Sequence, residues 1–325
     1  MKLCFVVGHE DTPEAYWRVL LPARHFRAPA LVVDVPETRT LALSAEVLWL
    51  YQPTGFAAAE LAEKAAARGR HVIVDMAENP WLRGECRTLP YRQARLDALE
   101  RALAVADTVV VSVPGLLPAF AGTARTVALP AVLPLSAQWM PAEPDVPPII
   151  SWWSDGRQRA GFEEVAPAVV AVLEHTGCRH HHLQFAHLRP LFAHITDDET
   201  HQGWARRFHV YLEGELPPEG NLAMLRDAMR PSAVAIECYP EGEYRETVSD
   251  VPLLRAAALG IPTLTTREHA PPGCLSAPPD AWEDALFEIL REPGPRRALS
   301  VEALRFAKSR ASFAPYDKLI EEVLP

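Results

Sequence analysis

Short runs of consecutive apolar residues recur along the first part of the chain, separated by longer segments in which apolar residues return every three or four positions. The short runs predict buried strands, and the longer segments predict helices. Strands that are apolar throughout and alternate with helices are typical of a parallel sheet covered on both faces. The predicted strands are residues 3–7, 30–33, 47–51, 71–74 and 108–113, and the predicted helices include residues 13–25, 56–67 and 89–105.

A proline-rich segment interrupts this alternation between residues 134 and 148. Proline at this density favours an extended chain and cannot join the interior of a sheet. We therefore expect residues 136–148 to link two domains. Beyond the prolines the alternation resumes, with strands predicted at residues 149–153, 181–185, 208–211, 233–236 and 262–265, and helices at 162–175, 221–229, 249–259, 280–290, 295–309 and 316–324.

The whole pattern predicts an α/β protein with two βαβ domains that face each other across a cleft. Ligands of open α/β sheets bind outside the carboxyl ends of the strands, so the cleft is the expected site. We expect a first domain over residues 1–135, the linker, a second domain over 149–308, and a terminal helix over 309–325.

The composition is that of a globular protein, since 49% of the 325 residues are hydrophobic and 23% are charged. Acidic residues (42) outnumber basic ones (32), and the net charge of −10 argues against a general electrostatic grip on nucleic acid or anionic lipid. Lysine stands at only four positions, so most basic residues are arginine. The planar fork of arginine suits phosphate and carboxylate groups.

Cysteine usage and the lengths of the apolar runs bear on the compartment. The five cysteines are scattered and none has C-x-x-C spacing, so we expect reduced thiols and a cytoplasmic location. The first apolar run is short and meets acidic residues by Glu10, unlike a signal peptide. No run approaches the length of a membrane span. The histidines at 180–182 lack the spacing of a helical metal site, so we expect no metal. The sequence contains no G-x-G-x-x-G fingerprint, which argues against a nicotinamide cofactor.

Polar residues after the predicted strands are the candidates for ligand binding. Ser249 and Asp250 precede an apolar helix, whose free amides and dipole favour an anion. The alternative is an ordinary helix cap. Arg157 and Arg159 follow another strand in a glycine-bordered loop, where guanidinium groups can reach phosphate oxygens. The alternative there is a solvated surface turn.

Acidic residues supply candidates for general acid–base chemistry. Asp75 and Glu78 lie just beyond the predicted strand at 71–74, and Glu241 lies in the loop after the strand at 233–236. In a cleft, such carboxylates can orient an acceptor or take up a proton. The alternatives are an aspartate that caps a turn and a solvated acidic loop.

Four segments carry a family resemblance through their order and spacing along the chain. They are SDVPLLRAAALGIPTLTT at residues 249–266, YWRVLLPARHF at 16–26, HVIVDMAENPWL at 71–82, and the run from 106 to 134. Together they resemble glycosyltransferases of the GT-B fold, of the retaining, GT4-like kind. The resemblance implies two Rossmann-like domains, with a nucleotide sugar such as a UDP- or GDP-sugar in the second and an acceptor in the first. It also implies a hexosyltransferase-type reaction without metal or cofactor, and a terminal helix that packs back toward the first domain.

Taken with the polar residues above, the resemblance implies a set of site residues. The expected catalytic residues are Asp75, Glu78 and Glu241. The expected donor-binding residues are Gly8, Arg18, Ser154, Gly156, Arg157, Arg159, Thr247, Val248, Ser249 and Asp250.

The chain departs from this family at several positions. Two glutamates eight positions apart are common in the family, and Thr247 and Arg255 stand at those positions here. Ala131 replaces the asparagine expected after Leu129-Pro130, and the usual phosphate-binding lysine is absent. A non-catalytic protein of the same fold, which binds a nucleotide or glycan or serves as a partner subunit, is therefore the alternative, and an epimerase is a second one. The acceptor is open between a glycan, a small molecule and a modified base of phage DNA, and the oligomeric state is open too.

Overall fold

The computed structural model describes residues 2–7, 15–33, 36–83, 92–122, 124–133, 148–154, 157–176, 179–185, 208–213, 229 and 232–324. Side chains are not described for residues 153–154, 159, 179–185 and 208–213. Gly8, Gly156, residues 136–147 of the expected linker, and residues 221–228 of an expected helix lie outside the described residues.

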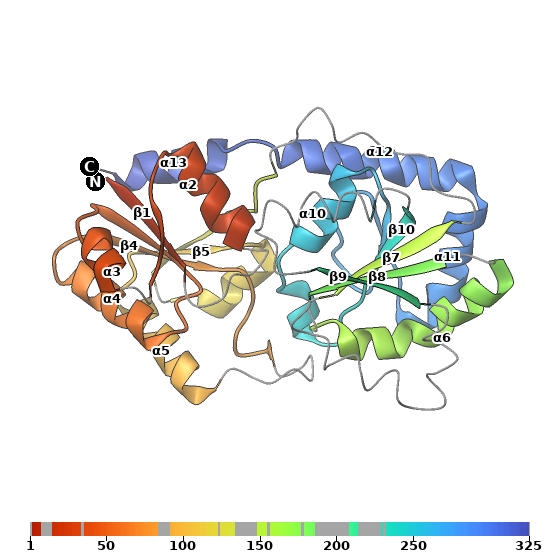
Figure 1. Cartoon of the computed structure of the whole chain (residues 1–325), viewed down its shortest axis with the longest axis horizontal. Coiled ribbons are helices and arrows are strands. Elements are labelled where there is room, and N and C mark those ends of the chain that lie inside the picture. The colour runs from red at the N-terminus through yellow and green to blue at the C-terminus, as the bar shows by residue number, and fades with distance from the viewer. Residues whose placement is uncertain are drawn as a thin grey trace.

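The first lobe is built on a six-stranded parallel sheet in the order β2-β1-β3-β4-β5-β6 (Figure 1). Its strands are β1 (Leu3–Val7), β2 (Ala30–Val32), β3 (Val47–Tyr51), β4 (His71–Met76), β5 (Thr108–Val111) and β6 (Arg125–Ala128). The helical connections are η1 (Tyr16–Leu20), which is a π-helical turn, α2 (Leu21–His25), α3 (Pro36–Ala42), α4 (Phe56–Ala66), α5 (Gln93–Ala104) and η3 (Pro114–Phe120), which is a 3-10 helix.

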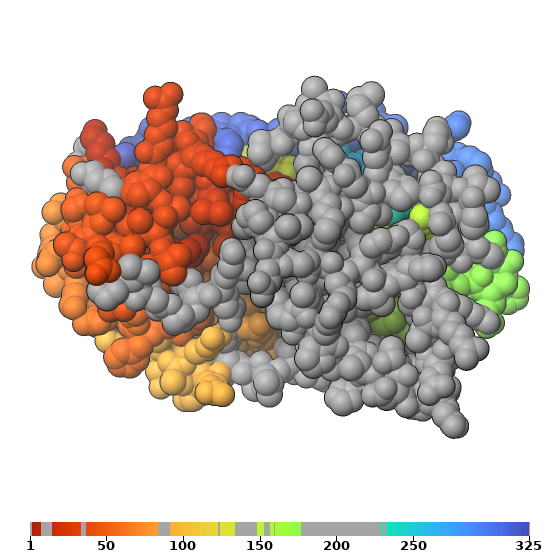
Figure 2. Space-filling model, viewed as in Figure 1, coloured from red at the N-terminus to blue at the C-terminus, as the bar shows by residue number. Residues whose placement is uncertain are grey.

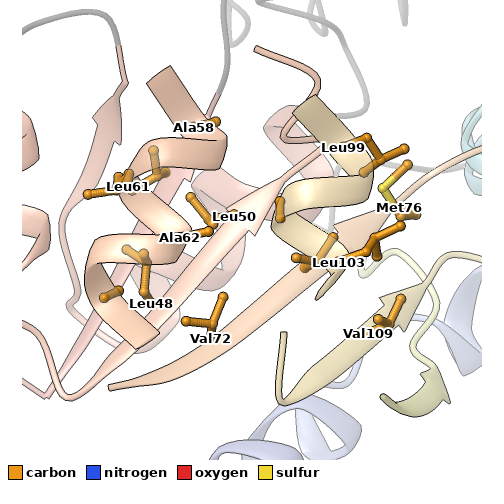
Figure 3. Packing of buried hydrophobic residues seen from close by; sticks show 14 of the residues in the cluster. Leu48, Leu50, Ala58, Leu61, Ala62, Val72, Met76, Leu99, Leu103 and Val109 are labelled. Atoms are coloured by element: carbon orange, nitrogen blue, oxygen red, sulfur yellow. The ribbon is translucent and has the colours of Figure 1, made fainter. Parts of the chain in front are cut away.

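Successive residues of each strand point to opposite faces of this sheet, and each face has its own cover. On one face, Leu48 and Leu50 of β3 and Val72 of β4 pack against Leu61 of α4 and Leu103 of α5 (Figure 3). All five residues are buried, which explains why these strands read as continuous apolar runs.

The second lobe repeats the design with another six-stranded parallel sheet, in the order β12-β11-β10-β7-β8-β9. Its strands are β7 (Ile149–Ser154), β8 (Arg179–Phe185), β9 (Phe208–Glu213), β10 (Ser232–Glu237), β11 (Thr263–Thr265) and β12 (Cys274–Ser276). Its helices and the terminal helix are α6 (Arg159–Thr176), η5 (Glu243–Glu246), α10 (Val251–Ala258), η6 (Pro279–Ala281), α11 (Trp282–Arg291), α12 (Pro293–Ser309) and α13 (Ala314–Val323).

The end of the chain returns to the first lobe. Helix α12 runs along the second lobe and α13 lies on the first (Figure 1), and C-terminal residues in blue appear at the margins of both lobes in Figure 2. Tyr316 and Ile320 of α13 are buried in a cluster with Phe5 and Trp49, on the sheet face opposite α4 and α5. The rings of Trp49 and Tyr316 stack with their centroids 5.8 Å apart.

Packing also joins the two lobes directly. Tyr16 and Trp17 of η1 share a buried cluster with Leu254 of α10 and Phe306 of α12. The first lobe thus contacts two helices of the second lobe through apolar side chains.

The expected α/β architecture with two parallel-sheet lobes is confirmed. The structure also contains α3, β6 and β12, which the apolar pattern does not predict. Strands β6 and β12 lie at sheet edges and are at least partly exposed along their lengths. Their sequences therefore lack the continuous apolar run of a strand that is buried on both faces.

Candidate functional site

The carboxyl end of the first sheet meets the loop that follows β10 in the second lobe. Leu82, in the loop after β4, packs against Tyr239, Tyr244 and Val248 of the second lobe. Gly115, just after β5, approaches the same loop so closely that a Cβ built there would lie 2.4 Å from the carbonyl oxygen of Glu246. Only glycine permits this approach without a backbone shift.

Glu78 reaches across this boundary to two side chains of the second lobe. One of its carboxylate oxygens accepts a hydrogen bond from Nη1 of Arg157 at 2.9 Å and another from the hydroxyl of Tyr244. Nη1 of Arg83 lies 3.8 Å from the other oxygen. The side chain of Glu78 is only 3% exposed. Glu78 and Arg157, which the sequence assigns to one site from different domains, are therefore brought together.

The surroundings of Glu78 favour its ionised form. Burial alone acts to raise the pKa of Glu78, but the charges of Arg157 and Arg83 and the hydrogen bonds from Tyr244 and Arg157 outweigh burial. The pKa therefore lies below its ordinary value. At neutral pH this boundary holds a buried carboxylate paired with a guanidinium group.

Asp75 and Arg18 also form an ion pair, but it lies inside the first lobe. Arg18 donates to Oδ1 of Asp75 from Nε at 2.7 Å and from Nη2 at 2.5 Å, and the indole of Trp49 donates to Oδ2 at 2.9 Å. Nη1 of Arg18 donates to the carbonyl of Leu129 at 2.8 Å. Both charged side chains are fully buried, so contact of either one with a ligand would require the pair to open.

The loop before α10 takes a different form from a simple helix start. Helix α10 begins at Val251 rather than at Ser249. The hydroxyl oxygen of Ser249 accepts the N–H of Val251 at 3.3 Å, and Pro252 has no N–H to offer. Positions 251 and 252 of the first turn therefore offer no free N–H, and further donors lie just ahead of the helix.

Those donors are the backbone amides of Val248, Ser249 and Asp250. None of the described residues accepts a hydrogen bond from them. Val248 and Ser249 are buried, and a buried polar group without a partner costs about 1–3 kcal/mol. Buried amides are nearly always satisfied, so these amides are suited to a ligand that carries acceptor oxygens.

A buried arginine holds the opposite side of this loop. Arg267 donates to the carboxylate of Glu237 from Nε at 2.8 Å and from Nη2 at 2.6 Å. It also donates to the carbonyls of Val248 and Ser249, each at 3.0 Å, and to Oδ1 of Asp250 at 3.3 Å. Burial acts to lower the pKa of Arg267, but the nearby charge of Glu237 outweighs it and raises the pKa, so the guanidinium keeps its charge.

The other expected site residues are spread around this boundary. Thr247 is buried, and both its N–H and its hydroxyl donate to the carbonyl of Tyr244. Glu241 is exposed in the loop after β10. Ser154 ends β7 and Arg159 begins α6, and their side chains are not described.

Sequence reasoning missed Tyr244, Glu237 and Arg267. A signal existed for the charged pair, because Glu237 directly follows the predicted strand at 233–236 and Arg267 follows the one at 262–265. Charged residues in those places lie at the carboxyl edge of a parallel sheet. Tyr244 carries no comparable signal, because its hydroxyl meets Glu78 only once both lobes are in place.

Metal ligands and membrane-spanning helices are the two remaining features to consider in the part of the chain that the structure describes. No group of three or more His, Cys, Asp or Glu side chains there is arranged to hold a metal ion. Nor does any described helix combine the length and the apolar character needed to cross a membrane.

Comparison with known proteins gives matches among solved structures alone. No protein-family model matches the chain, and no curated protein sequence matches it. Anabaena HepE in complex with UDP and glucose is similar in structure, with a TM-score of 0.70 at 12% identity over 99% of this chain and 98% of that one.

Two further solved structures are similar over a smaller share of their own length. Sucrose-phosphate synthase from Thermosynechococcus elongatus has a TM-score of 0.62 at 15% identity over 90% of this chain and 76% of that one. The pneumococcal O-GlcNAc transferase GtfA in complex with UDP and GlcNAc has a TM-score of 0.60 at 14% identity, over 88% and 58%. At such identities the likeness concerns the fold, and this chain has the GT-B fold of two Rossmann-like lobes.

Proposed function

We propose that this protein is a glycosyltransferase that moves a sugar from a nucleotide sugar to an acceptor hydroxyl. The proposal rests on the backbone amides of residues 248–250, which lie at the boundary of two GT-B lobes. None of the described residues accepts a hydrogen bond from these amides. Solved structures of similar fold bind UDP with a sugar, which supports a nucleotide-sugar donor.

The amides suit the chemistry of a diphosphate leaving group. In the transfer, the bond between the anomeric carbon and the phosphate oxygen breaks while the acceptor oxygen bonds to that carbon from the same face. Negative charge grows on the diphosphate, and preorganised N–H donors stabilise it. The amides and Arg157 supply positive charge from the protein itself, so we propose a reaction without metal or cofactor, and a chelator should leave its rate unchanged.

Glu78 and Arg157 take complementary roles in this proposal. Arg157 exchanges Glu78 for a phosphate oxygen of the donor, and the released Glu78 accepts the proton of the acceptor hydroxyl. Glu241, exposed in the loop after β10, is the candidate to accept hydrogen bonds from sugar or ribose hydroxyls. Arg18 and Asp75 have no part in it, because their contacts lie inside the first lobe.

The finer assignments follow the sequence resemblance. We propose a GT4-like hexosyl transfer that retains the anomeric configuration, with the donor on the second lobe and a glycan or small-molecule acceptor on the first, in the cytoplasm. A modified DNA base that carries a hydroxyl group is the alternative acceptor. NMR of the anomeric proton in the product distinguishes retention from inversion.

One matched pair of variants tests the amide site. The φ of Asp250 is −76°, close to the value that proline imposes. Asp250→Pro therefore deletes one amide donor, while Asp250→Ala removes the carboxylate alone. A hydrogen bond to a charged group contributes about 1.5–3 kcal/mol, so D250P should bind UDP or GDP roughly 10–100-fold more weakly than D250A in calorimetry. Equal affinities, or no binding of any nucleoside diphosphate by the unaltered protein, would reject the site.

A specific observation favours one alternative function. Thr247 and Arg255 stand where the resembling family has glutamates, and both are buried. The guanidinium of Arg255 lies 5.7 Å from the centre of the Trp17 ring. The alternative is a non-catalytic GT-B protein that binds a nucleotide or glycan or serves as a partner subunit. Diphosphate binding without hydrolysis or transfer of any tested sugar nucleotide would identify it.

A further inference from the structure

The contacts of Arg267 use the full donor capacity of its side chain. A guanidinium has five N–H groups, and Arg267 makes five hydrogen bonds, to Glu237, Val248, Ser249 and Asp250. Its side chain is 4% exposed. The bidentate contact with Glu237 fixes the plane of the guanidinium group. The N–H groups that donate to the two loop carbonyls are therefore fixed in direction as well.

The orientation of the loop amides follows from these carbonyl contacts. A trans peptide unit is planar, and its C=O and N–H point in opposite directions. Because the carbonyls of Val248 and Ser249 both point at Arg267, the N–H groups of Ser249 and Asp250 both point away from it. Two successive amides directed to one side form a concave donor of the kind that binds anions.

We infer that Arg267 is a positioning residue, which turns the loop at 248–250 into a two-amide donor for the diphosphate of a nucleotide sugar. This inference rests on the proposed function and adds the residue that orients the amides of the proposed diphosphate site. Arg267 itself does not contact the ligand, because it lies on the carbonyl side of the loop.

The charges around Arg267 fit a positioning role. Glu237 neutralises the guanidinium, and Asp250 is shared between Arg267 and Arg310, with Nη2 of Arg310 3.3 Å from Oδ2. The cluster of two arginines and two carboxylates is therefore neutral in sum. The attraction for an anion then comes from the oriented amides, and its strength depends on how precisely the loop is held.

Lysine cannot replace Arg267 in this role. The ammonium group is a single point with three donors and cannot keep the bidentate fork while it also reaches two carbonyls. Arg267→Lys keeps the charge and releases the carbonyls. Arg310→Lys is the matched control, because Arg310 also contacts Asp250 but neither of the two loop carbonyls.

The test compares a nucleoside diphosphate with its nucleoside by calorimetry, using UDP and uridine, or GDP and guanosine where GDP binds more tightly. R267K should weaken UDP binding at least 10-fold and change uridine binding less than 2-fold, while R310K should change both less than 2-fold. A general loss of structure would weaken the binding of UDP and of uridine to the same extent. An equal effect on the two ligands, or none on UDP, would overturn the inference.

A second measurement tests Arg267 even if the proposed function fails. Carbonyl carbon NMR shifts of Val248 and Ser249 should move in R267K and stay in place in R310K, with no ligand present. Unmoved shifts in R267K would overturn the positioning role, whereas failure of the unaltered protein to bind any nucleoside diphosphate would reject the proposed function instead. If R267K does not fold, the double variant E237Q/R267Q, which leaves neither buried charge unpaired, takes its place in both measurements.

Discussion

At the scale of single residues, the direction of the side chain distinguishes the two acidic candidates that lie close together in the sequence, since both are buried. Asp75 belongs to the alternating pattern of β4 and points, with Ile73, to the sheet face that α13 covers. Glu78 lies beyond the end of the strand and reaches the second lobe. The sequence places both at the carboxyl end of a strand. It cannot show which face is covered, because the covering helix comes from residues more than 200 positions later.

Arg18 is expected to be a stability residue. Arg18→Met leaves the carboxylate of Asp75 buried without its cation, which costs about 3–5 kcal/mol. Urea unfolding should show that loss, and the double variant Arg18→Met/Asp75→Asn should recover much of it because no buried charge remains. A single variant as stable as the parent protein would contradict the structural role of the pair.

The lowered pKa of Glu78 predicts a specific dependence of stability on pH. A carboxyl whose pKa is lower in the folded state adds stability above its unfolded pKa of about 4.3, and that stability is lost as pH falls through the folded value. The stability difference between the parent protein and Glu78→Gln should therefore be constant near neutral pH and shrink below about pH 4. Urea unfolding across this range measures it, and a difference that grew on acidification would refute the assignment.

At the scale of elements, short continuous apolar runs predict most strands of both sheets, because burial on both faces leaves a continuous signal. The edge strands β6 and β12 and the start of α10 depend on neighbouring elements, so the sequence alone misplaces or omits them. The amide loop shows the same limit. The apolar pattern starts the helix at Ser249, yet the helix begins at Val251, the hydroxyl of Ser249 accepts the N–H of Val251, and Pro252 has no N–H.

The contact between η3 and the loop after β10 gives a prediction at this scale. Gly115→Ala places a methyl group 2.4 Å from the backbone oxygen of Glu246, so the backbone on one side of this contact must shift. Overpacking of this kind costs about 1–3 kcal/mol, and the affinity for a nucleoside diphosphate should fall with it. Gly294→Ala is the control, because no atom lies within 4 Å of a Cβ there. Thermal unfolding and calorimetry should show a loss in G115A alone.

At the scale of the whole molecule, two kinds of contact hold the lobes together. Apolar packing joins η1 to α10 and α12, and the pair of Glu78 with Arg157 and Tyr244 lies at the carboxyl ends of the strands. The first contact needs no rearrangement when a ligand binds. The second does, because a phosphate that binds Arg157 must displace the carboxylate of Glu78.

Glu78 therefore competes with the ligand for Arg157. Glu78→Gln removes the competing charge but keeps the shape of the side chain, so UDP or GDP should bind several-fold more tightly to this variant, while sugar transfer falls because the proton acceptor is lost. Glu243→Gln is the control for charge alone, since Glu243 is exposed on η5, and it should change neither quantity. The double variant Glu78→Gln/Arg157→Ala should lose the gain in affinity, because the gain acts through the freed guanidinium. Tighter binding that survived the loss of Arg157 would show that Glu78 limits affinity by another route, such as general repulsion of the anionic ligand.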